Sequence, residues 1–313
     1  MMLHMWGIGL MIFAGVAASF ACGWIISTRQ KQRPKKSVTM LKPLDRSVDL
    51  QTVILQPPQF HIQPGNAQHV GRRQEQQDAF GFSDFNDISV VQTAGIFVTL
   101  ADGMGGLAKG SEASNLAVKV MLQQYAAHSE NESVPQALLR SLQAANEAVC
   151  QLAVQSNMEY NIGTTLMTAV IREDQLYWIS VGDSRIYLYR EGYLTQLTED
   201  HNYARKLQEE VIQGKLTREE ALTHPERNTL TSYLGIPKVE EVDQNWTSYP
   251  LRHGDVIMLC SDGLHGTLSE QEMVSCFAGH SDIQLLTEML VHKVLSKNSD
   301  NQDNVTVAML AYK

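Results

Sequence analysis

Apolar residues gather along the chain in short runs of the kind that form buried strands. These runs lie at residues 96–100, 165–171, 176–181, 186–189, 256–260 and 305–312. Other stretches repeat apolar residues at helical spacing and predict helices at residues 111–128, 135–156, 270–277 and 283–296. Arg190-Glu191-Gly192 predicts a hairpin turn. Long helices in pairs between groups of short strands indicate an α+β fold built in layers.

The start of the chain has a different pattern and predicts a transmembrane anchor over residues 1–27. Residues 5–26 contain no Asp, Glu, Lys or Arg, and a helix of that length spans a hydrocarbon core of roughly 30 Å. Trp6 and Trp24 lie near its ends, where the membrane interface favours such side chains. A cleaved signal peptide is the alternative, but no basic region precedes the apolar run, which is also long for such a peptide.

Residues 28–65 are rich in proline and predict a juxtamembrane linker that pairs locally with anionic lipid, followed by a folded domain over residues 66–313. Within residues 28–60, seven Lys or Arg stand against two Asp, which gives a net charge of +5. Basic residues directly after an anchor predict that the domain lies in the cytoplasm. The whole chain carries −9, so residues beyond this stretch carry −14. An acidic domain argues against general nucleic-acid binding.

The four cysteines agree with a reducing compartment. Cys22 lies in the apolar N-terminal segment, and Cys150, Cys260 and Cys276 are scattered through the rest. Since no pair has a spacing typical of a disulfide framework, we expect free thiols.

Five aspartates stand at the ends of strand-like runs or in short polar motifs. They are Asp78, Asp102, Asp183, Asp262 and Asp303. A single Asp-Gly after a strand would indicate only a turn. Several carboxylates brought to one end of a folded core would repel one another. Hard divalent cations, which take oxygen ligands, relieve that repulsion, so the pattern predicts a metal site.

The aspartates belong to an ordered set of motifs that resembles the type 2C metal-dependent Ser/Thr protein phosphatases, in their bacterial form. The resemblance covers about residues 66–313, and each motif is weak on its own while the ordered set is specific. The motifs are Arg73 to Asp78, Asp102-Gly103-Met104-Gly105-Gly106, Gly163-Thr164-Thr165, Gly182-Asp183-Ser184-Arg185, Leu197-Thr198-Glu199-Asp200-His201, Asn228 to Gly235, Ser261-Asp262-Gly263 and Asp303-Asn304.

This resemblance implies a fold and a chemistry. The fold is a four-layer α-β-β-α sandwich of two antiparallel sheets flanked by helices, with residues 199–235 as a flap beside the active site. The activity is hydrolysis of phosphoserine and phosphothreonine in proteins by a metal-activated water, with a cognate Ser/Thr kinase as the expected counterpart. Oxygen-only ligands favour Mn²⁺ or Mg²⁺ over zinc. The family holds two such ions, with a third, weaker one in addition.

The same resemblance assigns roles to individual residues. Asp78 and Asp102 form the bridging core, and Gly103 ligates through its carbonyl. Asp262 and Asp303 complete the second metal. A third ion would lie between Asp183 and Asp262. Arg73 grips the phosphate, and lysine is a poor substitute for that bidentate contact. The predicted catalytic residues are thus Arg73, Asp78, Asp102 and Asp262.

Three positions depart from the family pattern. Met104 stands where many eukaryotic members have a histidine proposed as general acid, so the donor of the leaving-group proton is open. Gln77 stands where glutamate is common, and Gln76 replaces a frequent asparagine. Gln77 removes a negative charge, so we expect weaker metal binding.

Other readings of the chain remain alternatives. Gly103 to Ala108 fits the dinucleotide fingerprint G-x-G-x-x-A, but Asp102 would repel a pyrophosphate and no acidic strand end follows at the required distance. His201 and His265 are proton-donor candidates, although a structural role is the stronger expectation for both. A non-catalytic phosphoprotein-binding module and a phosphatase of small metabolites are the alternative functions.

Overall fold

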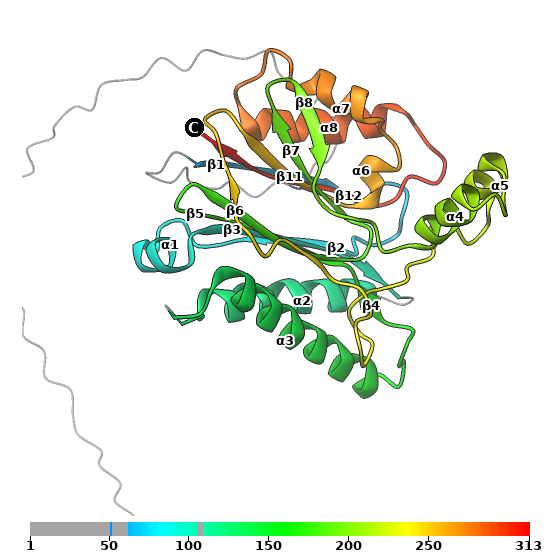
Figure 1. Cartoon of the computed structure of the whole chain (residues 1–313), viewed down its shortest axis with the longest axis horizontal. Helices are drawn as coiled ribbons and strands as arrows, with labels where there is room; N and C mark the ends of the chain where they lie inside the picture. The colour runs from blue at the N-terminus through cyan, green and yellow to red at the C-terminus, as the bar shows by residue number, and fades with distance from the viewer. Residues whose placement is uncertain (1–50, 52–61, 106–108, 130) are drawn as a thin grey trace, which may run out of the picture. The chain divides into compact units, whose positions relative to one another are not determined.

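The computed structural model describes residue 51 and residues 62–105, 109–129 and 131–313. Two antiparallel β-sheets lie face to face between two layers of helices (Figure 1). This confirms the expected arrangement of antiparallel sheets with flanking helices. The predicted anchor and most of the predicted linker fall outside the described residues. Within the described part of the chain, no helix combines the length and the apolar character needed to cross a bilayer.

The first sheet has the strand order β1-β12-β11-β7-β8. Its strands are β1 (Ile62–His69), β7 (Arg185–Arg190), β8 (Tyr193–Gln196), β11 (Val256–Cys260) and β12 (Val305–Tyr312). The second sheet has the order β10-β6-β5-β3-β2, with β4 paired to β3 and β9 paired to β6. Its strands are β2 (Asp78–Phe82), β3 (Ile96–Met104), β4 (Gly163–Thr164), β5 (Leu166–Arg172), β6 (Gln175–Val181), β9 (Asp243–Gln244) and β10 (Tyr249–Pro250).

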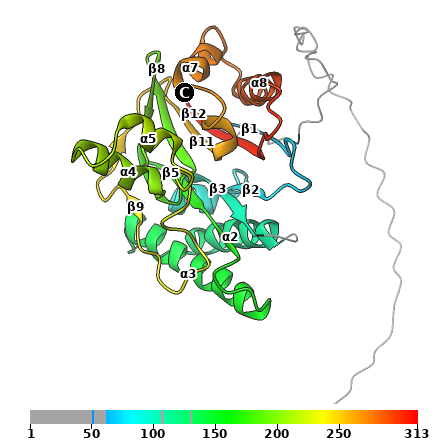
Figure 2. The ribbon, with the colours of Figure 1, turned by 90° about the vertical axis from the view of Figure 1, so that its right-hand side faces the viewer.

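Two long antiparallel helices cover the outer face of the second sheet, and two others cover the first sheet (Figure 1). The first pair is α2 (Lys109–Ala126) and α3 (Val134–Gln155), and the second pair is α7 (Glu270–Phe277) and α8 (Ile283–Ser296). The remaining helices are α1 (Ile88–Ala94), α4 (Tyr203–Ile212), α5 (Arg218–Thr223) and α6 (Asp262–His265). Helices α4 and α5 project from one end of the sandwich (Figure 1), the end that faces the viewer in Figure 2, and lie within the segment expected to form the flap.

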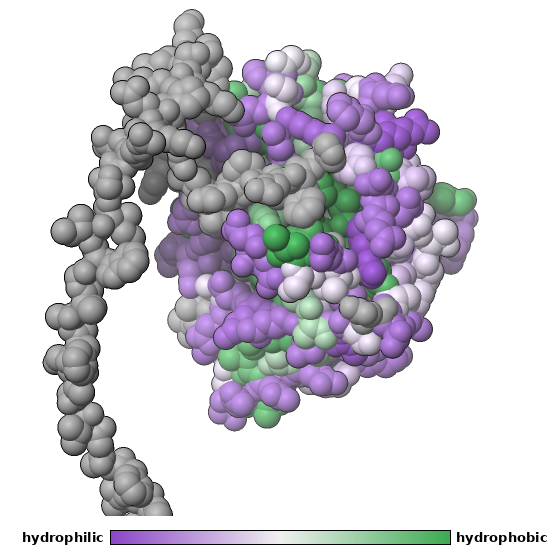
Figure 3. Space-filling view, turned by 90° about the vertical axis from the view of Figure 1, so that its left-hand side faces the viewer, coloured by the Kyte–Doolittle hydropathy of each residue, from purple (hydrophilic) through white to green (hydrophobic). Residues whose placement is uncertain are grey.

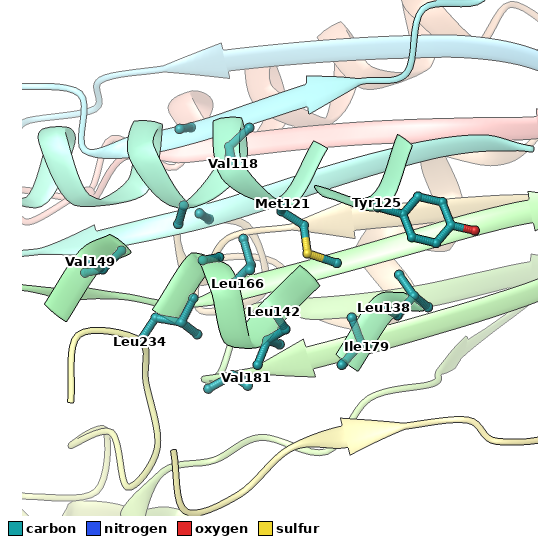
Figure 4. Close-up of a cluster of buried hydrophobic side chains, with 14 of the residues drawn as sticks. Val118, Met121, Tyr125, Leu138, Leu142, Val149, Leu166, Ile179, Val181 and Leu234 are labelled. Atoms are coloured by element: carbon teal, nitrogen blue, oxygen red, sulfur yellow. The ribbon is translucent and has the colours of Figure 1, made fainter. Parts of the chain in front are cut away.

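The core lies in three apolar layers because successive residues of a strand point to opposite faces of its sheet. In β3, Phe97 packs toward α2 and α3, whereas Ile96, Val98 and Leu100 pack between the sheets. Figure 4 shows the layer beneath α2 and α3, where side chains such as Met121 meet those of the sheet. Since helices or a second sheet cover both faces, the central strands are continuous apolar runs and not alternating ones.

Two local features test the predicted boundaries. The hairpin between β7 and β8 is confirmed: Arg190 pairs with Tyr193, and Glu191 and Gly192 between them have φ values of 52° and 88°. Positive φ at both turn positions matches the twist of paired strands. Strand β1 begins at Ile62, ahead of the expected domain start at residue 66, and pairs with β12 along its whole length.

The sandwich has two chemically different ends. Figure 3 shows the end away from α4 and α5, which is largely hydrophilic with hydrophobic residues between. A hollow of about 250 Å³ there is lined by residues that include Ile62, Val91, Ile96 and Tyr312. Strands β3 and β12, which have one end at this hollow, have Asp102 and Asp303 at or just beyond their opposite ends, so the predicted ligands lie on the side of the flap.

Candidate metal centre

The pairing of β2 with β3 sets two of the predicted ligands side by side. Asp78 opens β2 and lies directly opposite Asp102, near the end of β3. Directly opposed residues of an antiparallel pair have Cβ atoms roughly 5 Å apart. The two carboxylates therefore lie at the same end of the second sheet, as the sequence predicts.

The first sheet brings further aspartates to the same end. Strands β11 and β12 are antiparallel neighbours, with Cys260 opposite Val307. The chain leaving β11 places Asp262 at the first position of α6, and Asp303 lies just before β12. Asp183 occupies the connection from β6 of one sheet to β7 of the other. All five predicted aspartates thus converge where the two sheets meet.

Asp78 joins the two sheets through its side chain. Its Oδ2 accepts hydrogen bonds from Ser261 Oγ (2.8 Å), directly after β11, and from Thr306 Oγ1 (2.7 Å), in β12 of the first sheet. Its Oδ1 is buried and has no hydrogen-bond partner among the described residues, and the same holds for Asp262 Oδ1. A buried carboxylate oxygen without a partner is costly, so both atoms are suited to a cation.

Asp102 is held by the Gly163-Thr164-Thr165 motif through its backbone. Its amide N–H donates to Thr165 Oγ1 (2.8 Å), and its carbonyl accepts from Thr165 N (2.8 Å) and Thr164 Oγ1 (2.9 Å). Thr165 Oγ1 also lies 2.9 Å from Ser184 Oγ, next to Asp183. These bonds occupy the backbone of Asp102 and leave its carboxylate for the centre.

Gly103 has no room for a side chain. A Cβ atom there would lie 2.1 Å from the carbonyl oxygen of Gly110 and 2.8 Å from that of Gln77. The glycine lets β3 pass against the start of α2, which keeps its backbone at the centre. This explains the glycine of the Asp-Gly motif by packing, while its role as a carbonyl ligand stays a prediction.

The carboxylates strongly perturb one another. Burial, opposed in part by the hydrogen bonds from Thr306 and Ser261, raises the pKa of Asp78 to about 7. Burial and then the charge of Asp78 raise the pKa of Asp102 well above its usual value. Burial and then Asp262 raise the pKa of Asp183 to about 7, while burial and then Asp303 raise that of Asp262 to about 6. Without cations, the centre therefore holds protons near neutral pH.

The donor set fits hard divalent cations. It consists of carboxylate oxygens from five aspartates. Two of these oxygens are buried and have no partner among the described residues. Carboxylate oxygens are the ligands that Mn²⁺ and Mg²⁺ prefer. As the side chains stand, no three His, Cys, Asp or Glu groups in the described segments form a complete ligand set around one point. The carboxylate of Asp303 instead forms an ion pair with Arg73.

Arg73 lies at the rim of the centre in an ion pair. Its Nη2 is 2.6 Å from Asp303 Oδ2, and 60% of its side chain is exposed. The hydrogen bond and then the charge of Asp303 raise the pKa of Arg73. An exposed guanidinium beside an acidic centre can exchange this carboxylate for a phosphate, which its planar fork also fits.

Asn304 organises the loop that carries Arg73, a role that the sequence did not reveal. Its Nδ2 donates to the carbonyls of Val70 (2.8 Å) and Glu75 (3.0 Å), and its Oδ1 accepts from Gln77 N (2.7 Å). The Asp303-Asn304 motif was the available sequence signal for this role. Asp303 supplies the carboxylate, whereas Asn304 holds the loop in place.

The departures from the family pattern have structural roles here. Gln77 Nε2 donates to the carbonyl of Gly105 (3.0 Å) and fixes the loop after β3. Gln76 Oε1 accepts from the backbone N–H of Asp78 (3.0 Å).

The two candidate histidines are hydrogen-bonded to backbone groups. His201 Nδ1 accepts from Gly182 N (3.1 Å), and His265 Nε2 lies 3.0 Å from the carbonyl of Asp183. Burial lowers the pKa of both and brings that of His265 to about 4. Neutral, backbone-bound imidazoles are poor proton donors near pH 7, which supports the structural expectation.

A groove of about 750 Å³ separates the flap helices from the first sheet. It is lined by residues that include Arg185, Gln196, Asn202, Arg205, Arg218 and Arg227. Arg185 is held in place by Asp200, to which its Nη2 donates at 2.6 Å. The groove lies next to the centre because Asn202, which lines it, contacts the side chain of Asp183.

The architecture and its acidic centre define an enzyme of the phosphatase class. Residues 66–302 match the family model described as protein phosphatase 2C. The chain belongs to that family.

Individual relatives agree with this assignment. The serine/threonine phosphatase stp of Listeria monocytogenes is 33% identical over 217 residues, which cover 68% of this chain and 83% of the relative. The structure of the Streptococcus agalactiae serine/threonine phosphatase superposes with a TM-score of 0.69 at 28% identity, covering 80% of this chain and all of that one. The catalytic domain of the phosphatase PstP, solved in complex with two manganese ions, gives a TM-score of 0.65 at 26% identity over 80% of this chain and 97% of that one.

Proposed function

We propose that this protein hydrolyses phosphoserine and phosphothreonine in proteins, with Mn²⁺ or Mg²⁺ ions held by Asp78, Asp102, Asp262 and Asp303. The observation that carries the proposal is the pair of buried, partnerless carboxylate oxygens, Asp78 Oδ1 and Asp262 Oδ1, within a cluster of mutually repelling aspartates. The names of the relatives support the substrate class.

The chain's own residues prepare the site for this reaction. Ser261 and Thr306 donate to Asp78 Oδ2 and so aim its free Oδ1 into the centre. When bound, the ions lower the pKa of a water that attacks phosphorus and offset charge on the phosphoryl oxygens. Arg73 leaves Asp303 and binds two phosphate oxygens, which orients the ester and frees the Asp303 carboxylate.

Hydrolysis of phosphopeptides in the presence and absence of cations tests the proposal. We expect a phosphothreonine peptide to be hydrolysed with Mn²⁺ and to be stable in excess chelator. The variant Asp102→Asn, which keeps the side-chain volume and removes the charge, should be inactive in both conditions. Turnover undiminished by chelator would refute the metal-dependent mechanism. Binding without turnover, with Mn²⁺ present, would indicate a phosphoprotein-binding module, and faster turnover of soluble esters would indicate a metabolite phosphatase.

We further propose that residues 5–26 tether the enzyme to a membrane with its domain in the cytoplasm, where a cognate kinase supplies the substrates. The support is the uncharged segment followed by basic residues. Every proposed ligand lies after residue 72, so deletion of residues 1–27 should leave activity in solution unchanged. In cells the deletion should slow dephosphorylation of membrane-bound substrates, because tethering raises the effective concentration. A cytoplasm-only reporter fused after Lys313 should be active, and activity of an exoplasmic-only reporter would refute this orientation.

A further inference from the structure

Asn202 lies at the N-cap of α4 but does not cap it. Its backbone has the extended conformation usual for this position (φ −137°, ψ 171°), and its side chain makes no capping hydrogen bond. The side chain points the other way, with Nδ2 3.4 Å from Asp183 Oδ2. An N-cap asparagine normally satisfies a free N–H of the first helical turn, worth about 1 kcal/mol. Asn202 forgoes that bond to reach an aspartate of the centre.

The other end of the same amide has no partner. Asn202 is 7% exposed, and its Oδ1 is buried without a hydrogen bond to any described residue. Leaving a buried amide oxygen unpaired costs about 1–3 kcal/mol. Close by, Asp262 Oδ1 is also buried and unpaired, and the charge of Asp262 acts on Asp183. Asp183 thus interacts with two residues, Asn202 and Asp262, that each carry a buried oxygen without a partner among the described residues.

The backbone of Asn202 is where the flap joins the sandwich. The neighbouring residue His201 makes two hydrogen bonds with Gly182. The backbone N–H of His201 donates to the carbonyl of Gly182 (2.9 Å), and His201 Nδ1 accepts from the backbone N–H of Gly182 (3.1 Å). Asn202 itself pairs with Leu230, at the far end of the flap, in an antiparallel bridge. Helix α4 starts at the next residue, Tyr203. A change at the Asn202 side chain therefore acts on the first turn of α4 directly.

We propose that Asn202 is a positioning residue that ties the flap to a cation bound beside Asp183, with its Oδ1 as a neutral oxygen ligand. This rests on the proposed function, since it needs cations at the aspartate centre. Amide oxygens are ordinary ligands of hard cations, and Nδ2 of the same group holds Asp183 Oδ2. Occupancy of this weaker site fixes the start of α4, and with it the groove that α4 forms with β7 and β8.

The groove gives this coupling a consequence for substrate binding. Arg218 and Arg227 line it, and neither has an ion pair within the described residues. Fixing α4 presents these arginines in one arrangement next to the centre. We therefore expect loss of the Asn202 amide to raise the KM for a phosphopeptide more than it lowers kcat.

The experiment compares full-length wild type with Asn202→Ala, Asn202→Asp and the control Asn146→Ala. Asn146 is also a buried asparagine (8% exposed), and it holds the end of the flap by donating to Ile236 O and accepting from Gly235 N, without contact to the aspartates. Mn²⁺ binding is measured by calorimetric titration, and hydrogen exchange is measured over α4 with and without Mn²⁺. Wild type should show a weak Mn²⁺ site in addition to the tight ones, and filling it should slow exchange in α4.

Asn202→Ala should weaken only the weak site, by roughly ten- to a hundred-fold, and abolish the Mn²⁺-dependent protection of α4. Asn202→Asp should retain both, because its carboxylate supplies an oxygen at the same place. If Asn202→Ala fails to fold, the aspartate variant decides alone, and loss of the weak site in it would contradict the proposal. Asn146→Ala should lower stability and leave Mn²⁺ binding unchanged.

Two outcomes separate this inference from the proposed function. Wild-type affinity and α4 protection in Asn202→Ala would overturn the role of Asn202 while leaving the phosphatase mechanism intact. A wild type that binds tight ions but lacks a weak site would do the same. A wild type that binds no Mn²⁺ would overturn the proposed function itself.

Discussion

Replacing Asp183 by asparagine should change how the stability of the metal-free protein depends on pH. In the folded protein, burial first and then the charge of Asp262 raise the pKa of Asp183 from 3.8 to about 7, with Asp200 adding to the effect. The amide of Asn202 opposes it, and His265 faces the backbone carbonyl of the same residue. Asparagine has the shape of the neutral carboxyl and does not titrate, so the variant removes the titration of Asp183 and its charge effect on the neighbouring aspartates.

The sign follows from where the proton is held. Near pH 5.5 the folded carboxyl is protonated, whereas the same group in the unfolded chain is ionised. A raised pKa in the folded state contributes stability that is lost as pH rises through that pKa. Between about pH 5.5 and pH 7.5, wild type should lose about 2 kcal/mol relative to the variant. For a domain of this size the relative change in Tm is roughly 4–8 °C.

Calorimetric or urea unfolding in excess chelator, at several pH values, measures this difference. Asp87→Asn serves as the control, because Asp87 is an exposed N-cap whose hydrogen bond from Ser89 lowers its pKa. That group is ionised in both states throughout this range, so its difference from wild type should stay constant. A constant difference for Asp183→Asn would refute a raised pKa. Added Mn²⁺ should reverse the trend, because cations bind the ionised carboxylate.

Substitutions at three further positions test other parts of the centre. Arg73→Ala should raise the KM for a phosphopeptide at least ten-fold while leaving Mn²⁺ titration nearly unchanged, and Arg73→Lys should rescue it only in part because it lacks the planar fork; an unchanged kcat/KM would make this arginine structural. Thr306→Val removes one donor to Asp78 and should cost about 1.5–3 kcal/mol in the Mn²⁺-bound protein, measured as a lower urea midpoint; equal midpoints would show that this bond does not hold the carboxylate. Gly103→Ala should abolish activity with the far-UV circular dichroism preserved, since its Cβ would overlap the Gly110 carbonyl; wild-type turnover would contradict the close packing.

Helices and strands with many buried apolar residues were predictable from the sequence. Strands β11 and β12 and helices α7 and α8 have the predicted bounds, because their apolar residues face the core on one side or both. Strand β1 was not predicted, since Pro64 and Gly65 interrupt it and its partner is distant in sequence. An edge strand tolerates proline, and Gln284 of α8 satisfies the free backbone of β1 by bonding both Asn66 N and Asn66 O. Helix α4 gave no signal because Leu207 is its one buried residue.

The acidic residues of the centre were predictable, because several carboxylates at strand ends would repel one another in the folded protein unless a cation binds them. The residues that orient them were not. Ser261 and Thr306 are common residues in apolar surroundings, and their roles depend on a carboxylate from the other sheet. The Arg73–Asp303 ion pair and the loop contacts of Asn304 likewise join segments more than two hundred residues apart. Such pairings follow from the register of folded strands and leave no local pattern.

The hydrogen bonds of Asp78 make the centre dependent on the order in which the chain is completed. Asp78 comes from the second sheet, all of whose strands precede β11 in the sequence. Thr306, which orients Asp78, belongs to β12, and Asp303 lies just before it. A nascent or proteolysed chain that ends before Asp303 can complete the hydrogen bonding of the second sheet and still lack both groups. We therefore expect such truncated products to be catalytically silent, so that phosphatase activity would report that the last strand has been added.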